Sequence, residues 1–257
     1  MTKPLILTSL TGMPLVRPGD DLAALLRDGL GRAGIRLEVG DILAVTQKVV
    51  SKAEGRLVNL AEVQPSRAAG RLARESHKDP RLVEVILGES RKVLRVRPGL
   101  IIVRHRLGFV CANAGVDHSN VLGEGGEPHD WVLLLPEDPD ASARRIRERL
   151  LESTGIPPGV VILDSHGRAW RMGTVGVAVG VAGMPALLDL RGRPDLFGYL
   201  LQVTEVGAAD EVAAAASILI GQAAEGLPAV HVRGFPYPMR EGSIRELIRP
   251  EGQDLFT

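Results

Sequence analysis

The chain has 257 residues and a formal net charge of zero, because 31 Lys and Arg balance 31 Asp and Glu. This length allows one large domain or two small ones with a buried core. The charge balance argues against a global positive field that would attract nucleic acid or an anionic membrane. A single cysteine excludes an intramolecular disulfide. The sequence lacks a secretory signal and an apolar run of roughly 20 residues, so we expect a cytoplasmic protein without nucleic-acid or membrane partners.

The first half of the chain mixes predicted helices with short strands. Apolar spacing predicts a helix over residues 21–33, and Gly40-Asp41 opens a buried strand that passes into a helix or turn. Further helices are predicted over 66–76 and 81–90. Short strands follow between 93 and 135, separated by loops rich in Gly, Asp and Asn.

The second half begins with a clear helix over 140–152, capped by Asp140 or Ser142. A strand then ends at Asp164, and a glycine-punctuated apolar segment continues to residue 188. A long helix over roughly 203–221 and a last strand after Pro228 complete the pattern, and the polar tail from 235 is expected to be loose. Because strands and helices do not alternate regularly, the sequence predicts an α+β fold with mixed or antiparallel sheets.

Two polar loops that follow apolar strands are the strongest candidates for chemistry. In CANAGVDHSN, Asp117 lies among Asn and Ser oxygens, which are the ligands that a hard cation such as Mg²⁺ or Mn²⁺ takes. In VVILDSHGR, four apolar residues lead into Asp164, whose carboxylate is costly to bury unless a cation or donor meets it. The alternative is that each Asp only caps a turn. The sequence contains no P-loop, dinucleotide fingerprint or zinc-ligand spacing.

Other positions carry weaker signals. Lys52 follows an apolar strand and could meet phosphate charge, although a solvated surface lysine is the commoner case. His166 is either an acid–base group or a surface loop histidine. The glycines of 173–183 are spaced for close packing or a tight turn, and a phosphate loop is the less favoured alternative.

Taken together, these segments resemble the coenzyme F420-0:L-glutamate ligase (γ-glutamyl ligase) family. The resemblance includes GDILAVTQKVVSKAEGR, LIIVRHRLGFVCANAGVDHSN, VVILDSHGRAWRMGTVGVAVGVAG and IGQAAEGLPAVHVRG, and it stops near residue 235. We therefore assign residues 1–235 to one ligase domain and 236–257 to a C-terminal tail. The resemblance implies a family-specific α+β fold and an intertwined homodimer.

The same resemblance implies a set of site residues. It implies GTP bound without a P-loop, two divalent cations (Mg²⁺ or Mn²⁺) and a plausible K⁺. Asp117, Asp164 and Lys52 form the implied catalytic set. Gln222 occupies a position where some members of the family have Glu. The implied metal ligands are Asp117, Asp164, Ser165 and Gln222. The implied nucleotide contacts are Met13, Pro14, Leu15, Val16, Gln47, Lys52, Asn120, Ile220, Gly221, Gln222, Ala223, Ala224, Glu225, Gly226 and Leu227.

The implied reaction is amide formation on an activated carboxylate. GTP phosphorylates the terminal carboxylate of F420-0, and the amino group of L-glutamate attacks the acyl phosphate; repetition on the new γ-carboxylate lengthens the tail. Two alternatives use the same residues. One is a metal-dependent phosphohydrolase acting through the two Asp loops, and the other is a non-catalytic GTP-binding module.

Overall fold

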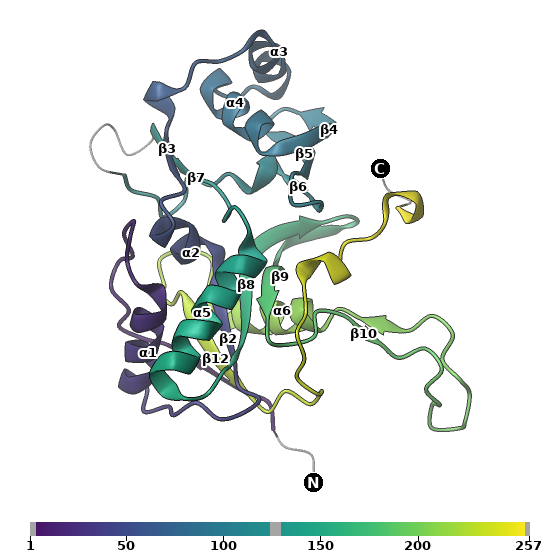
Figure 1. The fold of residues 1–257 in the computed structure, drawn as a ribbon. Helices are drawn as coiled ribbons and strands as arrows, with labels where there is room; N and C mark the ends of the chain where they lie inside the picture. Colours follow the sequence, from purple (N-terminus) through teal and green to yellow (C-terminus); the bar gives the residue numbers. More distant parts are fainter. Residues whose placement is uncertain (1–3, 124–129, 255–257) are drawn as a thin grey trace.

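The computed structural model describes residues 4–123 and 130–254, which form two lobes (Figure 1). The main lobe is built around a five-stranded sheet. The insert lobe, residues 60–116, is built around a three-stranded sheet. The chain leaves the main lobe through β3 (Leu57–Asn59) and returns through β7 (Trp131–Leu133), and these two strands pair antiparallel. The α+β prediction with mixed sheets is confirmed.

The main sheet has the strand order β1-β12-β2-β8-β9. Its strands β2 and β8 run parallel, whereas the other neighbours run antiparallel. The strands are β1 (Ile6–Ser9), β2 (Ile42–Thr46), β8 (Gly159–Arg168), β9 (Arg171–Ala182) and β12 (Ala229–Arg233).

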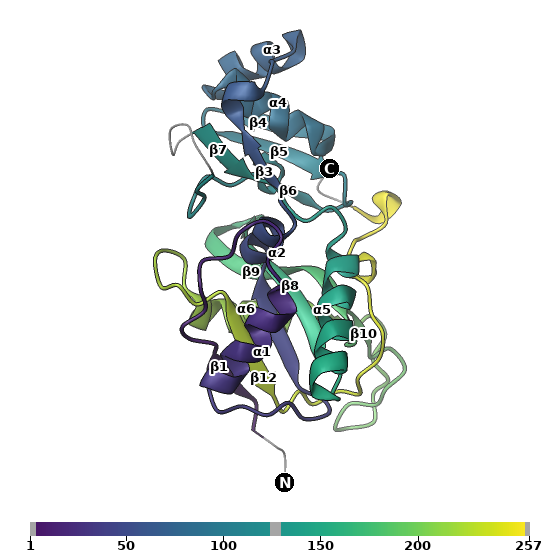
Figure 2. The ribbon, with the colours of Figure 1, turned by 60° about the vertical axis from the view of Figure 1, so that its left-hand side comes forward.

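Both faces of the central strands are buried under helices. Alternate residues of β2 pack into two separate apolar layers, Leu43 and Val45 into one and Ile42 and Ala44 into the other. Helices α1 (Leu22–Arg32) and α5 (Pro139–Thr154) contribute to the first layer, and α6 (Ala208–Ile220) contributes to the second (Figure 2). This explains why β2 reads as a continuous apolar run rather than an alternating one.

The insert lobe packs two helices on one face of a small antiparallel sheet. Ile101, Val103 and Cys111 point from the sheet into a core shared with the helices. The elements are η1 (Leu60–Glu62), α3 (Arg67–Ser76), α4 (Pro80–Gly88), β4 (Ser90–Arg97), β5 (Leu100–His105), β6 (Val110–Ala112) and η2 (Asn113–Gly115). The predicted helices over 66–76 and 81–90 are confirmed, because they correspond to α3 and α4.

The start of α5 corrects one capping prediction. Asp138 caps this helix, because its side chain accepts a hydrogen bond from Ala141 N. Asp140, predicted as a cap together with Ser142, instead accepts a hydrogen bond from Val181 N of β9 at 2.8 Å. The acidic residue two positions further on is therefore used for tertiary contacts.

The β8–β9 hairpin corrects a second prediction. β8 does not end at Asp164 but continues to Arg168, and the glycine-punctuated segment is its antiparallel partner β9. A Cβ atom at Gly176 would lie 2.5 Å from Ala213 O of α6, and one at Gly180 would lie 2.5 Å from Pro139 O of α5. Both glycines therefore allow close helix–strand packing, as the close-packing interpretation predicted. The phosphate-loop alternative is wrong.

The tail after residue 235 is ordered, which contradicts the expectation of a loose segment. Ile244 of η4 (Ile244–Glu246) belongs to the apolar layer under α6. The Asp140 carboxylate accepts hydrogen bonds from Ser243 Oγ at 2.6 Å and Ile244 N at 3.2 Å. Beyond η5 (Glu251–Gln253), Asp254 pairs with Arg104 of the insert lobe at 3.8 Å. The tail therefore connects the two lobes.

We predict that Ile244→Ala lowers the free energy of unfolding by about 2 kcal/mol, because it removes a buried side chain from a packed layer. Urea unfolding followed by circular dichroism measures the change. Arg245→Ala, at the exposed neighbouring position, is the control and should be close to wild type. Equal stability of Ile244→Ala and wild type would show that the tail does not stabilise the main lobe.

Residues 188–206 form an arm that projects from the main lobe (Figure 1). Its base is the short pair β10 (Leu188–Asp189) and β11 (Glu205–Val206). Leu196 and Phe197 on this arm are almost fully exposed. Among the described residues, none of the helices has the length and apolarity needed to cross a bilayer.

Candidate functional site

A cavity of about 1790 Å³ opens between the two lobes. Its volume exceeds the roughly 300–1,000 Å³ of a pocket for one small molecule, so it has room for more than one substrate. Every site residue proposed from the sequence lines this cavity. These are Met13, Pro14, Leu15, Val16, Gln47, Lys52, Asp117, Asn120, Asp164, Ser165 and the loop residues 220–227.

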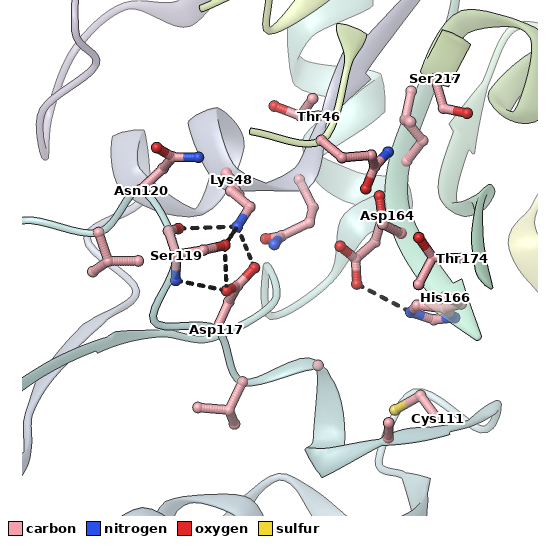
Figure 3. Close-up of a pocket in the computed structure, with 18 of the residues that line it drawn as sticks. Thr46, Lys48, Cys111, Asp117, Ser119, Asn120, Asp164, His166, Thr174 and Ser217 are labelled. Carbon is pink, nitrogen blue, oxygen red and sulfur yellow. Dashed lines mark hydrogen bonds and ion pairs between the residues drawn. The ribbon is translucent and has the colours of Figure 1, made fainter. Parts of the chain in front are cut away.

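Asp117 lies in a polar corner of the cavity with Lys48 and Ser119 (Figure 3). Its Oδ1 accepts hydrogen bonds from Ser119 N and Ser119 Oγ, both at 2.8 Å, and its Oδ2 pairs with the Lys48 ammonium. Burial alone would raise the pKa of Asp117, but the contacts with Lys48 and Ser119 outweigh it and the pKa lies below its ordinary value. The Asp117 carboxylate is therefore charged at neutral pH.

Lys52 and Asn120 join this corner to the loop that precedes β12. Lys52 Nζ donates to Asn120 O at 2.7 Å, and Asn120 Nδ2 donates to Ala223 O at 2.9 Å. Burial, together with the neighbouring charge of Lys48, lowers the pKa of Lys52, and Asp117 offsets part of this effect. Lys52 is thus a half-buried cavity residue, which favours the phosphate-contact interpretation over the solvated surface lysine.

Asp164 reaches the same cavity from the main sheet (Figure 3). Its carboxylate Oδ2 lies 3.0 Å from His166 Nε2, and both side chains are largely shielded from solvent. Ser165, the next residue of β8, lines the same cavity. The role of Ser165 as a metal ligand stays a prediction. The His166 ring lies 5.5 Å from the Phe109 ring, which brings the insert lobe close to Asp164.

The Asp117 corner has the oxygen ligands that a hard cation requires. The Lys48 ammonium is already a cation held by three kinds of oxygen: the Asp117 carboxylate, Ser119 Oγ at 2.6 Å and Ser119 O at 3.0 Å. Mg²⁺ commonly binds one or two carboxylates and completes its shell with water and substrate phosphates. Asp117 and Asp164 fit that pattern, although no three Asp, Glu, His or Cys side chains cluster within the described part of the chain.

The two glutamines proposed as ligand contacts differ in environment. Gln47 is fully buried at the start of α2 (Gln47–Ala53), and its Oε1 accepts a hydrogen bond from Ser51 Oγ at 3.0 Å. Its amide nitrogen has no partner among the described atoms. Gln222 is exposed on the loop over the cavity. The cavity position of both residues agrees with their predicted roles but does not test them.

Loop 220–227 folds around one of its own carboxylates. Glu225 accepts a hydrogen bond from Ala223 N at 2.8 Å, and backbone N–H groups of the loop lower its pKa. Gly221 has a φ of +77°, and a Cβ there would lie 2.2 Å from the Glu225 carboxyl carbon. Glycine is therefore required at 221 for this loop conformation.

The sequence profile described as F420-0:Gamma-glutamyl ligase matches residues 12–234. The chain belongs to this family. It is 47% identical over 252 residues to the coenzyme F420:L-glutamate ligase of Methanothermobacter thermautotrophicus, covering 97% of this chain and 98% of the relative. Identity is 49% with the ligase of that name from Methanopyrus kandleri, covering 94% and 93%, and 44% with that from Archaeoglobus fulgidus, covering 95% and 93%. The resemblance predicted from the sequence is confirmed, and the protein is an enzyme of the ligase class.

Within this ligase, sequence reasoning missed Lys48. In QKVVSK, Lys48 and Lys52 are four residues apart and therefore share one face of a helix, but this spacing is common on solvated helix surfaces. The partner of Lys48 lies 69 residues further along the chain, so nothing in the local sequence marks Lys48 as a site residue.

Proposed function

We propose that this protein joins L-glutamate to coenzyme F420-0 by an amide bond, with GTP as the activating co-substrate, in F420 biosynthesis. The family description supplies F420-0 as the acceptor, and the names of the relatives supply L-glutamate as the amino acid. The observation that carries the proposal for this chain is that one large cavity gathers all the residues that the family resemblance implies. We expect the reaction to take place in the cytoplasm.

The chemistry proceeds in two steps. The terminal carboxylate oxygen of F420-0 attacks the γ-phosphorus of GTP, the bond to the β–γ bridging oxygen breaks, and GDP leaves. The amino nitrogen of L-glutamate then attacks the acyl carbon, the bond to the phosphate oxygen breaks, and the amine gives its proton to solvent. Repetition on the new γ-carboxylate extends the tail. Such a reaction depends on positioning and charge stabilisation, and no protein nucleophile is needed.

The proposed site residues form two groups, one that contacts the nucleotide phosphates and one that binds the metal ions. Lys52 lies where it can offset phosphate charge, and residues 13–16 and 220–227 are the proposed nucleotide contacts, with Gln47 and Asn120 beside them. Asp117 and Asp164 would hold two divalent cations, Mg²⁺ or Mn²⁺, with Ser165 and Gln222 as further ligands and K⁺ as an additional ion. The cations would neutralise charge on the phosphates during transfer.

The exposed arm supports the proposal of a homodimer. Leu196, Phe197 and Val203 are 97%, 96% and 84% exposed, and they lie on one projecting segment. Exposed apolar residues gathered in this way are typical of an interface between protein chains. Light scattering should give the mass of a dimer for wild type and a monomer for Phe197→Asp. A monomeric wild-type protein would exclude this proposal.

The ligase proposal is tested with purified protein, GTP, Mn²⁺, L-glutamate and F420-0. Mass spectrometry should show glutamylated F420-0, with one GDP and one phosphate released per amide bond. GTP cleavage at full rate without glutamate would instead identify a phosphohydrolase. GTP binding without any product would identify a nucleotide-binding module.

A further inference from the structure

The cavity concentrates positive charge in a chain whose total charge is zero. Eight Lys and Arg but only four Asp and Glu are among the described residues that line it, whereas the whole chain carries 31 of each. Two of the cations, Lys48 and Lys52, belong to the corner around Asp117. Five others lie on the insert lobe and the β8–β9 hairpin: Lys92, Arg95, Arg97, Arg168 and Arg171. We call these five residues the cationic wall.

Three members of the cationic wall share one face of β4. The register of β4 on β5 shifts between Val93 and Arg95, so Lys92 falls on the same side of the strand as Arg95 and Arg97. Val93 and Val96 point the other way, into the insert-lobe core. The three cationic side chains therefore line the cavity together.

The same face of the insert sheet also carries apolar side chains. Leu100, Ile102 and Val110 line the cavity, and Val110 is 41% exposed. The opposite face already packs on the helices through Ile101 and Val103. An open face of an antiparallel sheet is usually polar, so an apolar centre with a cationic edge suits a ligand that has an apolar ring and an anionic chain.

The hairpin arginines strengthen this argument. Arg168 and Arg171 are direct cross-strand partners at the end of the β8–β9 pairing. Like charges placed opposite each other in a sheet are unfavourable unless an anion lies between or beside them. No carboxylate in the described part of the chain forms an ion pair with any member of the cationic wall, and Arg95 and Arg168 donate only to carbonyl oxygens.

We propose that the open face of the β4–β5–β6 sheet is the subsite for the deazaflavin acceptor. The planar ring lies on Leu100, Ile102 and Val110, and the cationic wall binds the anionic chain that ends in the reacting carboxylate. The subsite rests on the proposed ligase function and assigns its acceptor site to the insert lobe. The proposed nucleotide contacts on α2 and loop 220–227 belong to the main lobe, whereas the β4–β5–β6 sheet belongs to the insert lobe (Figure 2).

The position of Asp164 agrees with this division. The Asp164 carboxylate lies 3.0 Å from His166 Nε2, and the His166 ring lies 5.5 Å from the ring of Phe109 in the insert lobe, so the carboxylate is near that lobe. The acceptor carboxylate can then meet the γ-phosphate between the two lobes, next to Asp164. The acceptor approaches from the insert lobe and the nucleotide from the main lobe, so the acceptor carboxylate oxygen can reach the γ-phosphorus directly.

The test uses the double variant Arg95→Gln/Arg97→Gln and the single variant Val110→Asp. Each should raise KM for F420-0 by about tenfold or more, because charged hydrogen bonds and ring contacts are lost. KM for GTP and for L-glutamate should stay within about twofold. Arg91→Gln is the matched control, because Arg91 is exposed on the same strand but does not line the cavity. Unchanged KM for F420-0, or a rise in KM for GTP instead, overturns the subsite.

A binding experiment separates this inference from the ligase function. F420-0 is titrated into wild-type and variant protein without GTP or glutamate, and the deazaflavin fluorescence reports binding. Weaker binding by both cavity variants, but not by Arg91→Gln, supports the subsite whether or not wild type forms product. Equal binding by all variants, or no binding to wild type, overturns the subsite, whereas a missing glutamylated product contradicts the proposed function. Circular dichroism spectra that match wild type confirm that the variants fold.

Discussion

Asp117→Asn and Asp164→Asn should each lower the rate of GTP-dependent glutamate ligation by about 100-fold or more. Each substitution keeps the size of the side chain and removes one negative charge from the cavity. At Asp117 the lost charge is the partner of Lys48, and at Asp164 it is the carboxylate beside His166. Initial rates of GDP release, measured with F420-0 and glutamate at saturation, give the effect on kcat.

The control for both variants is Asp28→Asn, because Asp28 is a half-exposed aspartate on α1 that pairs with its neighbour Arg27 and does not line the cavity. It should keep the wild-type rate. A titration with Mn²⁺ separates cation binding from loop positioning, since loss of a metal ligand raises the Mn²⁺ concentration needed for half-maximal rate. If both cavity variants kept wild-type rates, the assignment of the two aspartates would be wrong even within the correct family.

The helices and buried strands were predictable because local patterns specify them. Asp21 and Ser66 cap α1 and α3 as N-cap residues should, and the apolar run after Asp41 forms the central strand β2. Asp117 and Asp164 were also predictable as site residues, because a carboxylate beside buried apolar residues needs a cation or a donor. Both line one cavity.

Other features depend on contacts between distant residues, which one sequence does not reveal. Glycines normally weaken a strand, so the sequence did not predict β9, where Gly176 and Gly180 allow helices α6 and α5 to approach. The tail looked loose because its apolar residues are sparse, yet Ile244 packs into an apolar layer that also contains Ile42. Its backbone N–H donates to Asp140, 104 residues earlier in the chain. The cationic wall likewise combines a strand and a hairpin from different lobes.

Asp41→Asn should lower the free energy of unfolding by about 3 kcal/mol, because it removes the buried anion from its contacts with Arg233 and His231. Asp41 precedes β2 and is almost fully buried. Arg233 donates to both of its carboxylate oxygens, at 2.9 and 2.7 Å, and His231 Nε2 lies 2.8 Å from Oδ2. Because the Arg233 side chain is one-third exposed, water can compensate part of the loss, and the estimate is at the lower end for a broken buried pair.

The control Glu38→Gln removes another carboxylate from the same arginine. Glu38 pairs with Arg233 at 2.7 Å, but its side chain is 66% exposed. A surface pair contributes at most about 1 kcal/mol, so this variant should be close to wild type in urea unfolding. Equal destabilisation by the two substitutions would show that burial of Asp41 does not determine its contribution.

The effect of Asp41 should also depend on pH in a defined direction. Burial raises the pKa of Asp41, but hydrogen bonds from Arg233, His231 and Glu38 N outweigh it, and the pKa in the folded protein is below its ordinary value. A carboxylate with a lowered pKa stabilises the fold above its unfolded pKa of about 3.9, and this contribution is lost as the pH falls through the folded value. The difference in stability between wild type and Asp41→Asn should therefore be constant from about pH 5.5 to 7 and should shrink below about pH 4. A difference that stayed constant down to about pH 2 would contradict the lowered pKa.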